Sequence, residues 1–72
     1  MMKASNLFGL EVIDSDARSV GTVHDLELDE KNWTVTTLII KTGFIKKVMV
    51  STQAIDKIGD KVVLKIASAK IQ

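Results

Sequence analysis

The sequence predicts an all-β fold, a small antiparallel β-barrel of five to six strands with one short helical or 3₁₀ turn. Short runs rich in Val, Ile and Thr are separated by turn residues at close spacing, which is typical of a barrel or sandwich. Two neighbouring runs also break strict alternation in a way that bends a sheet. At 72 residues the chain forms one domain with a thin core.

The strands are expected where β-branched and aliphatic residues cluster, and turns where Asp, Ser, Asn and Gly interrupt them. Residues 51–58 are expected to form the single helical or 3₁₀ turn, because Ser51 or Thr52 can cap it and Ile55 and Ile58 are three positions apart. Gly59 is expected to end this turn in a left-handed conformation. The predicted strands are residues 10–13, 19–29, 33–41, 48–50 and 61–66.

The first long strand does not keep one alternation of apolar residues. Val20 shares a face with Leu26, whereas Val23 falls on the other face if the pleat is regular. We expect a β-bulge near His24-Asp25, since one extra residue resets the pleat and bends the strand. Gly21 fits the same bend, because a glycine within a strand often marks a close backbone approach.

The second long strand shows the same three-residue step, from Val35 to Leu38. Two neighbouring strands that bend at similar positions can curl a sheet toward closure. On regular alternation Val35 shares a face with Ile39, opposite Leu38. The predicted core is Leu10, Val12, Val23, Leu26, Leu28, Leu38, Ile40, Val50, Ile55, Ile58, Val62 and Leu64.

The domain is predicted to span residues 7–66, with a lead-in at 1–6 and a tail at 67–72 that frays unless a partner holds it. Ser5 or Asn6 could cap one helical turn in the lead-in, which would deliver Leu7 and Phe8 to the core.

Composition excludes several kinds of site. The chain has no Cys and one His, so disulfides and thiolate metal sites are excluded and a zinc site within one chain is implausible. We expect no cofactor and no metal. The stability of so small a core must then come from tight packing or self-association. The sequence has no run of about 20 apolar residues and no signal peptide, so we expect a cytoplasmic protein without membrane insertion.

The first long strand carries the polar residues that could transfer a proton or bind a metal ion. His24 beside Asp25 could transfer a proton, but no Ser or Cys nucleophile lies in a recognisable setting, so a structural or surface role is favoured. Asp25, Glu27 and Asp29 alternate along the strand, as a solvated acidic face or a weak Mg²⁺ or Ca²⁺ site. We predict no catalytic, cofactor-binding or metal-ligating residue, and no enzyme.

Charge is distributed unevenly along the chain. Residues 1–36 hold three basic and seven acidic side chains, whereas residues 37–72 hold seven Lys and two Asp. The lysines could form a nucleic-acid surface, since Lys46-Lys47 flanks Phe44. Only three aromatic residues exist, so solvation or a protein partner is favoured over RNA.

Four large apolar residues lie where a monomer has little use for them, and they are the predicted partner interface: Trp33, Phe44, Ile45 and Met49. Trp33 opens a strand beside polar residues, and Phe44 and Ile45 follow a hairpin glycine. The alternative, a second small core, stays open.

The ordered glycines, valines and acids resemble the PRC-barrel family over roughly residues 7–66. The chain differs from the family at Ser51, where a proline is usual. The matching segments are Leu7-x-Gly9-x-x-Val12-x-Asp14, Val20-Gly21-x-Val23-x-Asp25-Leu26-x-Leu28-Asp29, Val35-x-x-Leu38-x-Ile40, Gly43-Phe44, Val48-x-Val50, Ile55-x-x-Ile58-Gly59-Asp60 and Val62-x-Leu64.

The resemblance implies a compact β-barrel that binds proteins, often as a dimer, and that is not an enzyme. The family includes the cytoplasmic domain of the photosynthetic reaction-centre H subunit, the C-terminal domain of a ribosome-maturation factor, and small archaeal proteins tied to cell division. We therefore expect an adaptor that forms a homodimer and binds a protein partner. This adaptor would be an accessory of cell division or of the assembly of another protein complex. The alternative is an accessory of RNA processing or ribosome assembly.

Overall fold

The computed structural model describes residues 2–71 as six strands in one mixed sheet. The predicted all-β class is confirmed, and the six strands fall within the predicted five to six. The helical content described is three 3₁₀ turns, where one short turn was predicted. The elements in chain order are η1 (Ala4–Asn6), β1 (Glu11–Ile13), β2 (Ser19–Asp29), β3 (Thr34–Thr42), β4 (Lys46–Ser51), η2 (Thr52–Ala54), β5 (Ile55–Ile58), β6 (Val62–Leu64) and η3 (Ser68–Lys70).

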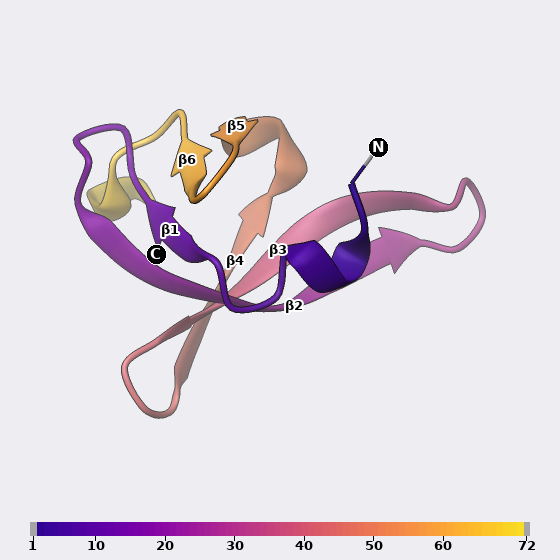
Figure 1. Ribbon diagram of the computed structural model, residues 1–72, viewed down its shortest axis with the longest axis horizontal. Helices are drawn as coiled ribbons and strands as arrows, with labels where there is room; N and C mark the ends of the chain where they lie inside the picture. The colour runs from indigo at the N-terminus through magenta and orange to yellow at the C-terminus, as the bar shows by residue number, and fades with distance from the viewer. Residues whose placement is uncertain (1, 72) are drawn as a thin grey trace.

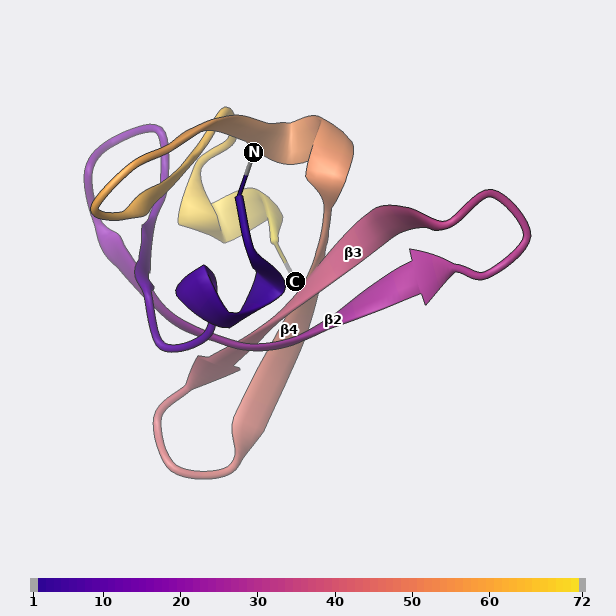
Figure 2. The same cartoon turned by 45° about the vertical axis from the view of Figure 1, so that its right-hand side comes forward.

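The sheet is barrel-like but not closed. Its strand order is β4-β3-β2-β1-β6-β5, so β4 and β5 are its two edges. The pairings are antiparallel except for β1 with β6, which run parallel. Figure 1 shows two hairpins projecting from the rounded body, the β2–β3 hairpin to the right and the β3–β4 hairpin to the lower left, and Figure 2 shows the same two projections from another angle.

The first long strand, β2, contains the β-bulge that the sequence predicts near His24-Asp25. In the pairing of β2 with β3, Val23 lies opposite Ile40 and Asp25 lies opposite Ile39, which leaves His24 as the extra residue. The extra residue returns Val23 and Leu26 to the same face of the sheet. The interrupted alternation between Val23 and Leu26 in the sequence therefore marks the bulge at which the sheet curls.

Gly21 allows the close approach that the curl requires. A methyl group at this position would overlap the carbonyl oxygen of Lys41 and lie 3.0 Å from Cγ2 of Ile40. Since the obstacle is backbone, no side-chain rotation relieves the overlap. The prediction of a close backbone approach at Gly21 is confirmed.

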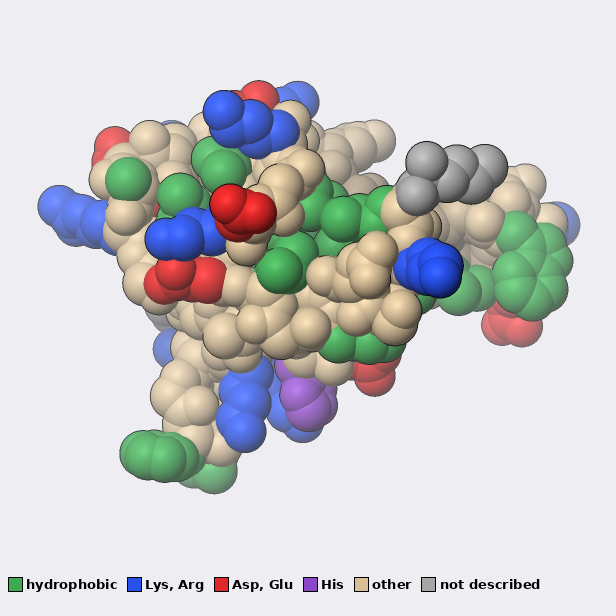
Figure 3. Space-filling model, in the orientation of Figure 1, with side chains coloured by type: hydrophobic (Ala, Val, Ile, Leu, Met, Phe, Trp, Pro, Cys, Tyr) green, Lys and Arg blue, Asp and Glu red, His purple; other side chains and the backbone are tan. Residues whose placement is uncertain are grey.

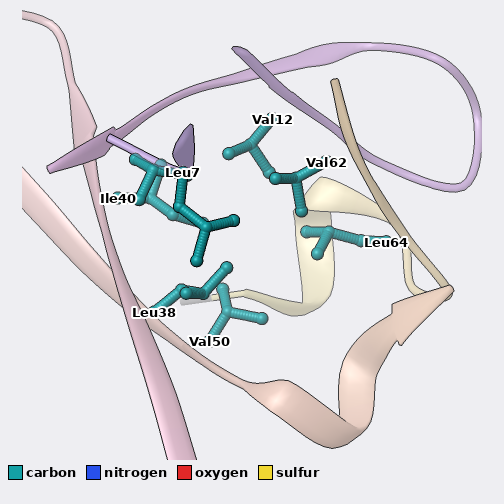
Figure 4. Packing of buried hydrophobic residues seen from close by; sticks show 8 residues of the cluster. Leu7, Val12, Leu38, Ile40, Val50, Val62 and Leu64 are labelled. Carbon is teal, nitrogen blue, oxygen red and sulfur yellow. The ribbon is translucent and has the colours of Figure 1, made fainter. Parts of the chain in front are cut away.

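The core lies inside the curl, between the sheet and the N-terminal segment (Figure 4). Of the predicted core, Leu10, Leu26, Ile55 and Ile58 are partly buried against it, whereas Leu28 lies outside. Leu7 joins the core from the turn after η1, but Phe8 beside it is exposed. The buried apolar residues are Leu7, Val12, Val23, Leu38, Ile40, Val50, Val62 and Leu64.

Leu38→Ala tests this core directly. Leu38 is 1% exposed at the centre of β3, so its truncation should lower the free energy of unfolding by about 2–5 kcal/mol. The change is measured by urea denaturation. Leu28→Ala is the matched control on the neighbouring strand, and an equal loss in both variants would contradict the assignment of Leu38 to the core.

A buried carboxylate joins the two ends of the chain. Asp14 is 1% exposed, and its Oδ1 accepts from the N–H groups of Asp16 and Arg18 at 2.9 and 2.8 Å. Its Oδ2 accepts from the N–H of Ser68 at 2.7 Å. The hydrogen bond from Arg18, helped by those from Ser68 and Asp16, outweighs burial and lowers the pKa of Asp14 from 3.8 to about 2.

This contact also corrects the prediction of a frayed tail. Residues 67–71 are held by the Asp14–Ser68 hydrogen bond and by Ile71, which packs against the core. The last predicted tail residue, Gln72, and the first lead-in residue, Met1, lie outside the described residues.

The predicted turn over residues 51–58 is only partly correct. The 3₁₀ turn η2 covers Thr52–Ala54, and Ser51 caps it by accepting from the Gln53 N–H at 3.2 Å. Ile55 and Ile58 instead lie in strand β5, opposite Leu64 and Val62.

Two predicted local features are wrong. Gly59 is not among the residues with positive φ, so the predicted left-handed end of a turn is absent there. Neither Ser5 nor Asn6 caps η1, whose N-cap position is Lys3 and which has no side-chain cap.

Candidate functional site

The predicted interface residues are exposed, but they lie in three places. Trp33, 79% exposed, sits at the end of the β2–β3 hairpin. Phe44 and Ile45, 97% and 92% exposed, form the end of the β3–β4 hairpin. Met49, 59% exposed, lies along β4 opposite Ile39. The four side chains therefore do not form one patch.

The β2–β3 hairpin ends in a turn that its own side chains build. Asp29 accepts from the Lys31 N–H at 3.0 Å through Oδ1, and from the Asn32 amide at 2.9 Å through Oδ2. The loop then returns to β3 through Trp33, which adopts a left-handed conformation with φ 55°. Such a φ is a real outlier for a bulky residue, because its Cβ crowds the backbone.

Trp33 is thus in the turn, one residue before the strand that it was predicted to open. Glycine or asparagine would fit this φ better. A tryptophan that is both strained and exposed gives the folded monomer little benefit, and strained residues cluster at functional sites.

Two further exposed apolar residues, Leu28 and Val35, lie a short way along the same hairpin from Trp33. Leu28 and Val35 lie opposite each other in the β2–β3 pairing, 43% and 40% exposed. A second bulge leaves Thr36 without an opposite residue, and its hydroxyl oxygen lies 3.4 Å from that of Thr37. This bulge puts Val35 on the face of Leu38 rather than that of Ile39, which corrects the predicted parity.

The projection of the hairpin, and not its register, explains why Leu28 is not in the core. Leu28 and Val35 keep the inward face, but the projecting hairpin has carried this face beyond the body of the barrel. We call Leu28, Trp33 and Val35 the arm surface. Figure 3 shows hydrophobic side chains at the right-hand end of this projection, with acidic side chains beneath them.

Two of the three acidic residues of β2 form local hydrogen bonds. Asp25 accepts from the Leu26 N–H at 2.8 Å, and Asp29 is used in its turn. His24 is exposed at the first bulge. Within residues 2–71 no three His, Cys, Asp or Glu side chains gather closely enough to hold a metal ion.

An open depression lies on the opposite side of the sheet, over β5 and β6. It measures about 460 Å³, and its apolar lining comes from Ile13, Ile58 and Val63. Lys57, Asp60 and Lys61 also line it. Lys61 Nζ also pairs with Glu11 at 3.0 Å, and this hydrogen bond lowers the pKa of Glu11.

The family model of the PRC-barrel domain matches residues 1–71. The chain belongs to the PRC-barrel domain family. A search of curated proteins gave no match. The curled six-strand sheet agrees with the barrel-like fold that the resemblance implies.

The PRC-barrel domain contains, within residues 2–71, no helix long and apolar enough to cross a bilayer. Its three aromatic side chains lie apart, Phe8 beside η1 and Trp33 and Phe44 at the ends of different hairpins. They do not form the adjacent aromatic platform that stacks RNA bases.

Proposed function

We propose that this PRC-barrel domain is a non-catalytic protein-interaction module that binds through its arm surface, with a second copy of the chain as its first partner. The observation that carries the proposal is Trp33, an exposed tryptophan held in a strained conformation beside an apolar pair. Tryptophan is the side chain most enriched at the energetic centres of interfaces. A wider adaptor role, in cell division or another assembly, would build on this contact.

A second copy supplies a complementary surface. The arm is acidic around its apolar residues, since Glu27, Asp29 and Glu30 lie on or beside it. The depression over β5 and β6 is lined by apolar residues together with Lys57, Asp60 and Lys61, a net charge of +1. Opposite charges around apolar centres favour this pairing and fix its orientation. The proposed contact therefore seats Trp33 of one copy against Ile58 and Val63 of the next.

Trp33→Gly separates binding from folding. Glycine adopts the left-handed φ without strain, so the melting temperature should stay equal or rise, while the dissociation constant of self-association increases at least about tenfold. Sedimentation velocity over a concentration series measures the association, and a thermal melt measures the stability. Phe44→Ser is the control, because it removes an exposed aromatic from the other hairpin.

Charge reversal gives an independent check. Lys57→Glu should weaken self-association, and adding Glu30→Lys should restore part of it, as the two charges exchange sides. A strictly monomeric wild-type protein, or a Trp33→Gly variant that associates as the wild type does, would rule out the proposed contact.

The alternative function, an accessory of RNA processing or ribosome assembly, relies on the lysines of the second half of the chain. An RNA shift assay at increasing salt distinguishes it, since binding through phosphates weakens steeply with salt. The separation of the aromatic residues is the reason for placing it second.

A further inference from the structure

The end of the β3–β4 hairpin carries apolar and basic side chains, whereas the arm carries apolar and acidic ones. Gly43 turns the chain at φ 70°, and Phe44 and Ile45 follow with almost their whole side chains in solvent. In Figure 3 hydrophobic side chains occupy the lower-left end of the molecule, with basic side chains and the histidine behind them. We call the set Lys41, Phe44, Ile45, Lys46 and Lys47 the basic tip.

The charges of the basic tip are unbalanced within the chain. No Asp or Glu occurs between Lys31 and Ile55, so the hairpin holds only positive charge. Lys41 lies directly opposite Lys47 on the neighbouring strand, and like charges in this position repel. The salt bridge found among residues 2–71 is that of Lys61 with Glu11, elsewhere on the sheet. An external anion would relieve the repulsion at the tip.

We propose that the basic tip docks this domain on an anionic lipid membrane. Phe44 and Ile45 enter the boundary between headgroups and acyl chains, while the three lysines contact lipid phosphates. The hairpin rests in one leaflet and does not cross the bilayer. This proposal rests on the β3–β4 hairpin alone and is independent of the contact proposed for the arm.

The shape of the tip favours a bilayer over a protein. Protein interfaces centre on side chains sealed by a surrounding rim, and they are depleted in lysine. The basic tip is instead a narrow projection with its apolar residues foremost and its lysines behind. A fluid bilayer accepts such a projection without a shaped pocket, and its acidic lipids favour the lysines. RNA phosphates could contact the lysines of the tip, but RNA offers no apolar surroundings for Ile45.

Vesicle co-sedimentation of the full chain tests the proposal. The protein should bind phosphatidylcholine vesicles that contain phosphatidylglycerol, and bind weakly to phosphatidylcholine alone. Each lysine near an anionic surface contributes about 1 kcal/mol, a factor of about five in binding. Lys46→Gln with Lys47→Gln should therefore reduce binding about 25-fold, and Phe44→Ser with Ile45→Ser should reduce it at least as much, since both apolar anchors are lost.

Two matched variants control for charge and apolarity. Lys3→Gln with Lys65→Gln removes the same charge from exposed positions outside both the arm surface and the basic tip, and Phe8→Ser removes an exposed aromatic beside η1. Both should retain wild-type binding to the vesicles. All of the residues changed in these variants are exposed, and circular dichroism checks that each variant folds.

An indole at the tip reports directly on insertion. In a Trp33→Phe background, Phe44→Trp puts the sole tryptophan at the basic tip, where anionic vesicles should shift its emission to the blue. The proposal is overturned if the wild type does not bind anionic vesicles at low salt, or if the control lysine pair loses as much binding as the tip pair. It is also overturned if the Phe44 and Ile45 changes spare vesicle binding while abolishing self-association or RNA binding.

Discussion

Gly21→Ala is expected to leave a large fraction of the protein unfolded at room temperature. The added methyl group would overlap the Lys41 carbonyl oxygen, so β2 and β3 would have to separate where the sheet curls. Forced backbone displacement of this kind belongs with the large mutational effects, about 3–5 kcal/mol. A core of this size supplies only about 3–5 kcal/mol of net stability. The free energy of unfolding should therefore fall close to zero.

Gly59→Ala is the control for Gly21→Ala. A methyl group at Gly59 meets no atom within 4 Å, and the φ of this residue lies outside the left-handed region. Urea denaturation followed by circular dichroism should show a nearly unchanged midpoint for this variant. If Gly21→Ala kept the wild-type midpoint, the close approach of β2 and β3 would not be a requirement of the fold.

Asp14 is expected to make stability depend on acid. Its pKa is lowered from 3.8 to about 2 in the folded protein, so the folded state favours the carboxylate. The stabilisation is complete above pH 3.8 and is lost as the pH falls through about 2. Asp14→Ala should lower the urea midpoint at neutral pH, because three partly buried N–H groups lose their acceptor.

The acid dependence provides the decisive measurement. Between pH 4 and pH 2 the wild-type midpoint should fall more than that of Asp14→Ala, so the two curves converge at low pH. Asp16→Asn, two residues away and exposed, should follow the wild type throughout. Parallel curves for the wild type and Asp14→Ala would show that the Asp14 carboxylate is not what links acid to unfolding.

The curl of the sheet was predictable because a β-bulge shifts the alternation of apolar and polar residues along a strand. Val23 breaks the pattern of its strand, and glycine two positions earlier allows the neighbouring backbone to approach. The same reasoning failed at Leu28, which alternates correctly but lies beyond the body of the barrel. Alternation reports which face a side chain shares, and not how far along that face the core extends.

The prediction of a helical turn over residues 55–58 was wrong for another reason. Two isoleucines three apart fit a helical turn, but Ile55 and Ile58 also fit a strand whose pairing contains an irregularity. Pairing with β6 decides between the two, and that partner becomes visible only in three dimensions. Asp14 was missed likewise, because one of its three hydrogen-bond donors, Ser68, is 54 positions away.

The candidate surfaces were partly visible in the sequence. Trp33, Phe44, Ile45 and Met49 stood out as large apolar residues outside the core pattern, and the structure places them all in solvent. Their division between two hairpins could not be foreseen, since it depends on how far each hairpin projects. Val35 could have been added, because its three-residue step to Leu38 repeats the step that marks the first bulge.

The parallel pairing of β1 with β6 and the Asp14–Ser68 hydrogen bond have a kinetic consequence. The pairings β1–β2, β2–β3 and β3–β4 form between neighbours in the chain, whereas the β1–β6 pairing and the Asp14–Ser68 hydrogen bond join distant segments, 54 positions apart for the hydrogen bond. The chain loses loop entropy before these contacts stabilise anything, and such non-local closure is slow. During synthesis β1 to β4 would therefore exist as an open meander whose inner face is covered only after β6 has been made.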